Sequence, residues 1–170
     1  MLETRRPVGV IPGGGRGLRI GGSKLAVALR GRPLISDPLA AMRQALPDVA
    51  VIVKADAVLP DLPGTMVWIE PDAPRSPLLG IVEALALPGG RPVLVCPADL
   101  PFVTPDLLAA LAGSPDNGAP AAVASRDGVI RPLLGCYRPR AAGLLARVGC
   151  GDVAPRVGSW GREIPGISRM

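Results

Sequence analysis

The chain has 170 residues, the size of one compact domain, and 48% of them are hydrophobic, so its 22 glycines and 21 prolines do not indicate disorder. It contains no histidine, which excludes mechanisms built on a Ser-His or Cys-His pair and metal sites built on histidine. The formal charge of +5 is scattered along the chain and only 2% of residues are aromatic, so we expect a solvated basic surface that favours phosphorylated substrates, with no nucleic-acid partner.

The cysteines and the apolar runs indicate the compartment. Cys96, Cys136 and Cys150 are widely spaced and form no C-x-x-C motif, so the sequence predicts neither a disulfide framework nor a zinc ribbon. No apolar stretch has the length of a membrane span, and the first residues lack the apolar core of a signal peptide. We therefore expect a cytoplasmic protein without a membrane partner.

The first two thirds of the chain alternate between predicted strands and helices. In chain order, the pattern predicts a strand at 8–12, a helix from 38 to about 45, strands at 49–53 and 66–69, a helix at 78–87, a strand at 92–96 and a helix at 107–112. Each helix is preceded by a capping residue and a proline, in the pairs Asp37-Pro38, Ser76-Pro77 and Thr104-Pro105.

The remainder contains one hairpin signal. Strands at 121–125 and 129–134 flank a tight turn at Asp127-Gly128, a weaker helix follows at 140–148, and the tail after Gly149 has no periodicity. The whole pattern predicts a single domain over residues 1–170, an α/β three-layer sandwich with a mostly parallel sheet plus one antiparallel hairpin. Ligands bind such sheets outside the carboxyl ends of the strands, so we expect the chemistry in the loops after Pro12, Ile69 and Cys96.

The loop after the first strand is rich in glycine. Its glycines include Gly13, Gly14, Gly15 and Gly17. Exposed amides in such a loop form a nest for phosphate, and Arg19 and Lys24 add the positive charge that a triphosphate needs. The alternative is a plain turn. Neither the Walker A pattern nor the dinucleotide fingerprint fits the spacing.

A single carboxylate follows the strand at 92–96. Asp99 lies between two prolines, Pro97 and Pro101, and aspartate is a usual ligand of Mg²⁺, which takes one or two carboxylates together with phosphate oxygens. The plainer alternative is a turn or helix cap. We expect Asp99 to be the metal ligand.

These segments together resemble one enzyme family. The pattern G-G-x-G-x-R-x-G at 14–21 followed by Lys24, the segment Gly31-Arg32-Pro33-Leu34, and the Pro-x-Asp-x-Pro motif around Asp99 resemble the MobA-like NTP transferase family of molybdenum cofactor guanylyltransferases, over roughly 8–148. The resemblance implies a Rossmann-like nucleotidyltransferase fold, GTP as substrate and Mg²⁺ as cofactor. It implies nucleotide contacts at Gly13, Gly14, Gly15, Gly17, Arg19, Lys24, Lys54, Asp72 and Asp99.

An acidic segment between the two motifs resembles the part of the family associated with base recognition. Either Glu70 or Asp72 could occupy the acidic position, and we favour Asp72. A carboxylate there would accept hydrogen bonds from N1 and N2 of guanine, which adenine lacks. Lys54 stands where the family often has an asparagine near the nucleotide.

The resemblance implies transfer of GMP from GTP to the terminal phosphate of molybdenum-bearing molybdopterin. That phosphate is already anionic near neutral pH, so no general base is required and the missing histidine is understandable. Mg²⁺ on Asp99 would bridge the phosphates, while Arg19 and Lys24 would stabilise the leaving pyrophosphate. Molybdoenzymes or other cofactor-biosynthesis proteins would be its partners. The alternatives are a related transferase that uses CTP or another phosphorylated acceptor, and a nucleotide-binding protein that has lost catalysis.

Overall fold

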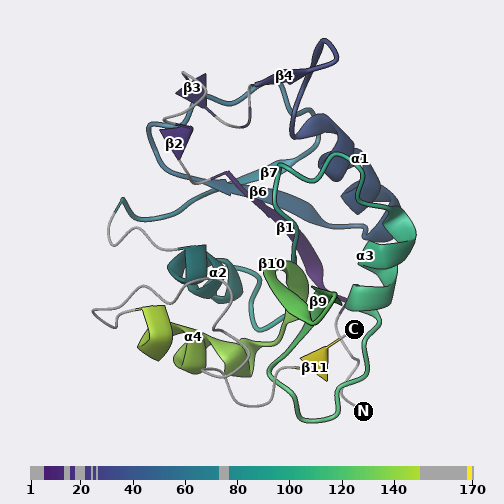
Figure 1. Cartoon of the computed structure of the whole chain (residues 1–170). Helices are drawn as coiled ribbons and strands as arrows, with labels where there is room; N and C mark the ends of the chain where they lie inside the picture. The colour runs from purple at the N-terminus through teal and green to yellow at the C-terminus, as the bar shows by residue number, and fades with distance from the viewer. Residues whose placement is uncertain are drawn as a thin grey trace.

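A computed structural model of the chain describes residues 6–13, 25, 27–72 and 77–149, and the short strands at 16–17, 22–23 and 168–169. Within these residues, the central element is a seven-stranded sheet with the order β11-β9-β10-β8-β1-β6-β7. Helices pack on both of its faces (Figure 1). The predicted three-layer α/β sandwich is confirmed.

Four adjacent strands form the parallel part of the sheet. They are β8 (Val93–Val95), β1 (Val8–Pro12), β6 (Val49–Val53) and β7 (Met66–Ile69). The runs of valine and isoleucine in β1 and β6 are buried on both faces, as continuous β-branched segments in a covered parallel sheet should be. These strands match the predicted ones, although β8 is shorter than predicted by one residue at each end.

Helices α1 (Ser36–Ala45) and α3 (Pro105–Ala112) cover one face of the sheet. Helices α2 (Pro77–Ala86) and α4 (Ala142–Gly149) cover the other, with a short 3-10 turn, Pro139–Ala141, before α4. Alternate residues of each strand supply the two layers of core between them. In β6, for example, Ala50 and Ile52 join the core under α2 while Val51 joins the core under α1.

The predicted helix caps have different outcomes. Thr104 caps α3, because its Oγ1 accepts a hydrogen bond from the Leu107 backbone N–H at 3.3 Å. The Asp37 cap is wrong, since α1 begins at Ser36 and Asp37 lies in its first turn. Burial of Ile35 explains the shift, because this fully buried residue already has helical backbone angles and brings the chain into the helix before Asp37. The third predicted cap, Ser76, lies outside the described residues.

The antiparallel part of the sheet is the hairpin of β9 (Ala121–Arg126) and β10 (Val129–Tyr137). Asp127 and Gly128 both have positive φ, as the predicted two-residue turn requires. Strand β10 extends three residues beyond the predicted end because its last residues also pair antiparallel with β8.

Besides this predicted hairpin, the structure contains antiparallel pairs that the sequence did not predict. Strands β4 (Ala28–Leu29) and β5 (Arg32–Pro33) form a second hairpin around Arg30 and Gly31, which both have positive φ. Two further pairings involve segments of two residues, which give no sequence signal: β2 (Arg16–Gly17) pairs with β3 (Gly22–Ser23), and β11 (Ser168–Arg169), in the tail, pairs parallel with β9.

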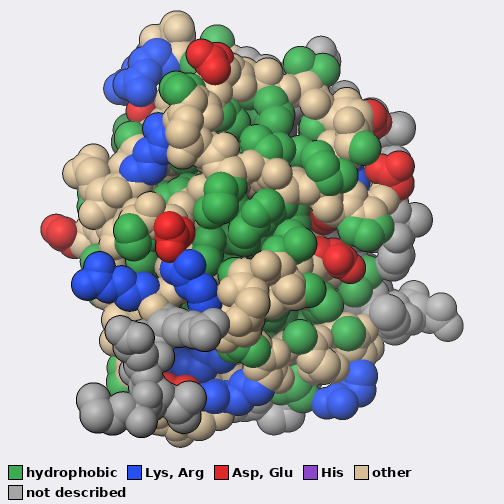
Figure 2. All heavy atoms as spheres, turned by 180° about the vertical axis from the view of Figure 1, so that it is seen from behind, with side chains coloured by type: hydrophobic (Ala, Val, Ile, Leu, Met, Phe, Trp, Pro, Cys, Tyr) green, Lys and Arg blue, Asp and Glu red, His purple; other side chains and the backbone are tan. Residues whose placement is uncertain are grey.

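Strand β7 is the outermost strand on one side of the sheet, and its Met66, Val67 and Ile69 side chains are exposed. Seen from behind, the molecule has hydrophobic side chains gathered across the middle of its surface (Figure 2). None of the helices in the described part of the chain combines the length and apolarity that crossing a bilayer requires.

Candidate active site

The predicted site residues follow the carboxyl ends of the parallel strands. These strand ends together form the edge of the sheet at which the site lies. Because β8, β1, β6 and β7 are adjacent and parallel, the segments that follow them leave the sheet on the same side. Gly13 follows β1, Lys54 follows β6, Asp72 follows β7 and Asp99 follows β8. Gly13 and Asp99 therefore follow neighbouring strands, as convergence on one triphosphate requires.

The start of the glycine loop packs tightly on β6. The Gly13 amide donates a hydrogen bond to the Ile52 carbonyl at 2.7 Å. A methyl group on Gly13 would lie 2.6 Å from Val53 Cγ1 and still closer to the buried Leu25 side chain, so no larger residue fits without movement. Glycine is thus required here by close packing, independently of any ligand.

Most of the predicted phosphate loop lies outside the described residues. Gly14, Gly15, Arg19 and Lys24 belong to this undescribed part. Gly17 is described as part of β2, where it pairs with Gly22 of β3. The loop therefore leaves β1 at the expected edge, and its contacts with phosphate stay a prediction.

Asp99 lies in the turn that connects β8 to α3. Its residue is exposed, whereas Cys96 and Ala98 just before it are buried. Burial, and next the nearby Asp99 carboxylate, raise the pKa of the Cys96 thiol to about 12. Asp99 thus presents a negative charge at the edge of the sheet, above a thiol that stays neutral.

Lys54 and Glu70 form a largely buried ion pair between the ends of β6 and β7. The Lys54 Nζ lies 3.5 Å from Glu70 Oε1 and donates a hydrogen bond to the Pro71 carbonyl. The other Glu70 oxygen would lie 3.0 Å from a methyl group on Gly80, so the carboxylate packs directly against α2. Glu70 is thereby enclosed between a strand end and a helix.

Asp72 differs sharply from Glu70. It is exposed, two residues further along the same segment, and 73–76 after it lie outside the described residues. Of the two candidate acids, Asp72 is therefore the one whose side chain solvent reaches. Its contact with a base stays a prediction.

The described residues contain no group of three or more His, Cys, Asp or Glu side chains that could enclose a metal ion. A single carboxylate such as Asp99 can hold Mg²⁺ only together with phosphate oxygens and water, which is the way this ion usually binds in nucleotide sites. The donor set at this edge thus fits a metal that arrives with a triphosphate.

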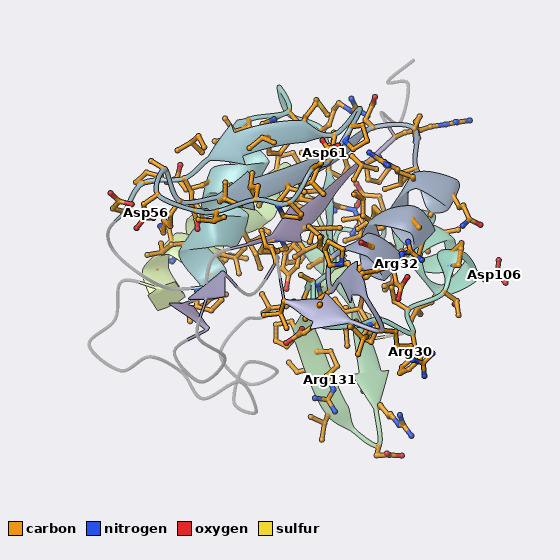
Figure 3. The ribbon with its side chains drawn as sticks, turned by 90° about the horizontal axis from the view of Figure 1, so that it is seen from above. Arg30, Arg32, Asp56, Asp61, Asp106 and Arg131 are labelled. Atoms are coloured by element: carbon orange, nitrogen blue, oxygen red, sulfur yellow. The ribbon has the colours of Figure 1, made fainter. Side chains whose placement is uncertain are left out.

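Arg30, Phe102 and Arg131 lie outside the set of predicted site residues. The Arg30 guanidinium lies 6.0 Å from the centre of the Phe102 ring, and Phe102 is 79% exposed. Arg131 extends from β10 (Figure 3).

Comparison with known protein families gives one match over most of the chain. A family profile described as "MobA-like NTP transferase domain" matches residues 9–159. A Chloroflexus aggregans protein named "Probable molybdenum cofactor guanylyltransferase" is 36% identical over 82% of this chain and 69% of its own length. A "Molybdenum cofactor guanylyltransferase" of Rhizobium leguminosarum is 34% identical over 76% of this chain and 62% of its own length. The matches thus span about two thirds of these relatives.

Solved structures agree on the fold. Molybdopterin-guanine dinucleotide biosynthesis protein A from Archaeoglobus fulgidus has a TM-score of 0.73 at 23% identity, covering 95% of this chain and 82% of that one. A Mycobacterium tuberculosis protein solved in complex with manganese has a TM-score of 0.71 at 19% identity, covering 98% of this chain and 88% of that one.

Proposed function

The chain belongs to the MobA-like NTP transferase domain family, and from that premise we propose that it transfers GMP from GTP to the terminal phosphate of molybdenum-bearing molybdopterin. One observation of the structure carries the proposal. Gly13 and Asp99 follow adjacent parallel strands, so a triphosphate cradled by the loop after β1 lies within reach of the carboxylate after β8.

The reaction exchanges one phosphate linkage for another. An oxygen of the acceptor phosphate forms a bond to the α-phosphorus of GTP, and the bond from that phosphorus to the oxygen leading to the β-phosphorus breaks. The electron pair leaves with pyrophosphate. Because a phosphate monoester already carries the negative charge it needs near pH 7, no side chain has to remove a proton. The chain has no histidine that could do so.

Because no proton has to be removed, the side chains contribute positive charge and hold the reacting phosphates in position. Amides of Gly14, Gly15 and Gly17 would bind the phosphates, and Arg19 and Lys24 would stabilise the pyrophosphate as it leaves. Lys54 would add charge at the β6 end, although its ammonium is already shared with Glu70 and Pro71.

We assign the divalent ion to Asp99. The donor set at the edge of the sheet fits Mg²⁺ bound jointly by this carboxylate, phosphate and water, and the manganese complex of the structural neighbour supports a divalent metal. When bound, such an ion neutralises charge that develops on the phosphates.

Recognition of the base is assigned to Asp72. Exposure of this carboxylate at the end of β7 supports the assignment, because N1 and N2 of guanine both donate hydrogen bonds. We place the enzyme in the cytoplasm, with GTP and molybdopterin as small-molecule partners and molybdoenzymes or other cofactor-biosynthesis proteins downstream.

The test compares substitutions of two aspartates that follow β8 in the chain. Asp99→Asn should lower Mg²⁺-dependent pyrophosphate release, measured with GTP and molybdenum-bearing molybdopterin, by about a hundredfold or more. Asp106→Asn removes the same charge seven residues later, in the first turn of α3, and should keep the wild-type rate. Equal rates for wild type and Asp99→Asn would contradict the assignment.

The same assay separates the alternatives. Pyrophosphate release with CTP in preference to GTP would favour a related transferase. Tight GTP binding with no pyrophosphate released, acceptor present, would favour a binding protein without catalysis.

A further inference from the structure

Strand β7 is the outermost strand of the sheet, and its free side is open to a further strand. The Glu70 amide donates to the Val53 carbonyl of β6, so the backbone groups of Glu70 face β6. Successive residues of a strand turn these groups to opposite sides, so the N–H and C=O groups of Val67 and Ile69 point away from the sheet. In the described part of the chain, no strand pairs with this side of β7.

The side chains of β7 are apolar on both faces of the sheet. Val67 and Ile69 are 44% and 57% exposed on the face that α1 and α3 cover, and Met66 is 43% exposed on the other face. Many outermost strands contain a charged residue, a proline or a bulge that discourages pairing, and β7 contains none of these. The view from behind faces the side of the molecule away from the β9–β10 hairpin, and hydrophobic side chains gather there (Figure 2).

The backbone of β7 is complementary to a second copy of itself in antiparallel orientation. When Val67 of one copy lies opposite Ile69 of the other, the two residues exchange both backbone hydrogen bonds, and twofold symmetry repeats the pair. A shifted register loses bonds, because it brings in Pro71, which has no N–H, or Thr65, whose N–H already donates to a carbonyl of the preceding turn. The register centred on Trp68 therefore satisfies every outward-facing group of Val67 and Ile69.

The same register also matches the side chains. On the face that α1 and α3 cover, Val67 of each copy lies beside Ile69 of the other. On the opposite face, the two Trp68 side chains meet at the twofold axis. Directly opposed residues have Cβ atoms about 4.5–5.5 Å apart, close enough for such apolar and aromatic pairs to stabilise the contact. Pairing thus covers apolar side chains that a single copy exposes.

The charges at the two ends of β7 favour this antiparallel arrangement. At the start of the strand, the exposed Arg43 side chain of α1 donates hydrogen bonds to the Pro63 carbonyl and the Thr65 hydroxyl. Asp61 lies two residues before Pro63, but Arg43 is the charge in contact with the start of β7. Just beyond the end of the strand, Asp72 is exposed. Antiparallel pairing brings Arg43 of one copy toward Asp72 of the other, whereas parallel pairing would place like charges side by side.

We propose that the chain forms a twofold dimer in which β7 pairs antiparallel with β7 of a second copy, with Val67 opposite Ile69 and Trp68 at the axis. The two seven-stranded sheets then form one continuous sheet. Because the contact is limited to a short strand and its flanks, its Kd should lie in the micromolar range. The proposal goes beyond the transferase reaction and does not depend on it, since association is measured without nucleotide or acceptor.

The experiment is analytical ultracentrifugation of the full chain at micromolar to submillimolar concentrations. Wild type should shift from monomer to dimer as its concentration rises and should grow no further, because a twofold interface closes on itself. Val67→Lys and Ile69→Glu each put a charge into the apolar contact, and each should weaken the dimer by about ten- to a hundredfold. Circular dichroism shows whether each variant is folded.

Val129→Lys is the matched control, because Val129 is a 47% exposed valine of β10, toward the other end of the sheet. This variant should dimerise as wild type does. It carries the same change in charge and apolarity as Val67→Lys, so a difference between the two variants belongs to the position on β7.

A mixture of Val67→Lys and Ile69→Glu tests the register. In the mixed dimer the introduced lysine and glutamate face each other, and the unchanged Val67 and Ile69 form the second pair. The mixture should therefore associate about tenfold more tightly than either variant alone. The proposal is overturned if wild type stays monomeric, which would leave β7 to a strand of another protein, or if it grows beyond a dimer. It is also overturned if either single variant dimerises as wild type does, or if the mixture associates no better than its components.

Discussion

The Lys54 ammonium lies 3.5 Å from the Glu70 carboxylate, and this pair links the ends of β6 and β7 beneath the proposed base site. Both side chains are largely buried, 18% and 10% exposed. The Glu70 amide also donates to the Val53 carbonyl, so backbone and side chains hold the same junction. Glu70 is thereby occupied with structure, whereas Asp72 is exposed to solvent.

Breaking this pair from one side should destabilise the fold. Lys54→Met leaves a buried carboxylate without its partner, and we expect the free energy of unfolding to fall by about 3 kcal/mol. The double variant Lys54→Met, Glu70→Leu should recover much of the loss, since neither charge then remains buried. Urea unfolding of wild type, Lys54→Met, Glu70→Leu and the double variant measures these differences. Arg126→Ala, which removes an exposed pair with Asp127, is the control and should change stability by less than about 0.5 kcal/mol. Simple additivity of the two single changes would argue against the pair.

Asp72 should control the choice of base. Asp72→Asn keeps a hydrogen-bond acceptor but loses the charge and adds a donor, so we expect the preference for GTP over ATP to fall by about tenfold or more. The preference is the ratio of kcat/KM values for pyrophosphate release. Glu70→Gln is the control, because it should lower stability while keeping the preference. If Glu70→Gln lost the preference for GTP and Asp72→Asn kept it, Glu70 would recognise the base in place of Asp72.

The parallel core could be predicted from the sequence because local pattern and final environment agree there. The continuous valine and isoleucine run of β6 is buried on both faces, as its composition indicates. The Asp127-Gly128 turn was also predictable, because the dipeptide itself supplies two residues that accept positive φ. In both cases a few neighbouring residues contain the whole signal.

Features that depend on distant contacts could not be read locally. Burial of Ile35 decides where α1 begins, and that burial exists only once the helix packs on the sheet. Arg30-Gly31 is a weak turn signal, since arginine seldom adopts positive φ. The sequence offers both Glu70 and Asp72 for base recognition and favours Asp72, but the structural role of Glu70 depends on its pairing with Lys54 across two strands, which no local pattern shows.

Gly13 should be intolerant of even one added carbon. A methyl group there would overlap Val53 and Leu25, so Gly13→Ala should lower the free energy of unfolding by about 2 kcal/mol. Adding Val53→Ala should remove one of the two overlaps, so the double variant should lose less stability than the sum of the two changes. Gly143→Ala on α4 is the control, because nothing lies within 4 Å of the added carbon and alanine is the better helix former. Urea unfolding of wild type, the two single variants, the double variant and the control measures this, and strict additivity would show that the overlap is relieved by other movements.

Alkaline pH should destabilise the fold through buried acids of β10. Burial, opposed by the nearby Arg138, raises the pKa of the Cys136 thiol from 9.0 to about 11, and burial also raises the pKa of Tyr137. The folded state therefore holds these protons after the unfolded chain has lost them. The contribution of Cys136 is fully present below pH 9 and is lost as pH rises toward 11, by about 3 kcal/mol in total.

The measurement is the urea midpoint at pH 7, 9, 10 and 11 for wild type and Cys136→Ala. Wild type should lose stability steadily above pH 9, and the variant, although less stable at pH 7, should show a shallower decline. The difference in slope isolates the thiol, since Tyr137 is present in both proteins. Parallel declines would mean that the Cys136 thiolate is accommodated in the folded protein, either by Arg138 or by water reaching the sheet.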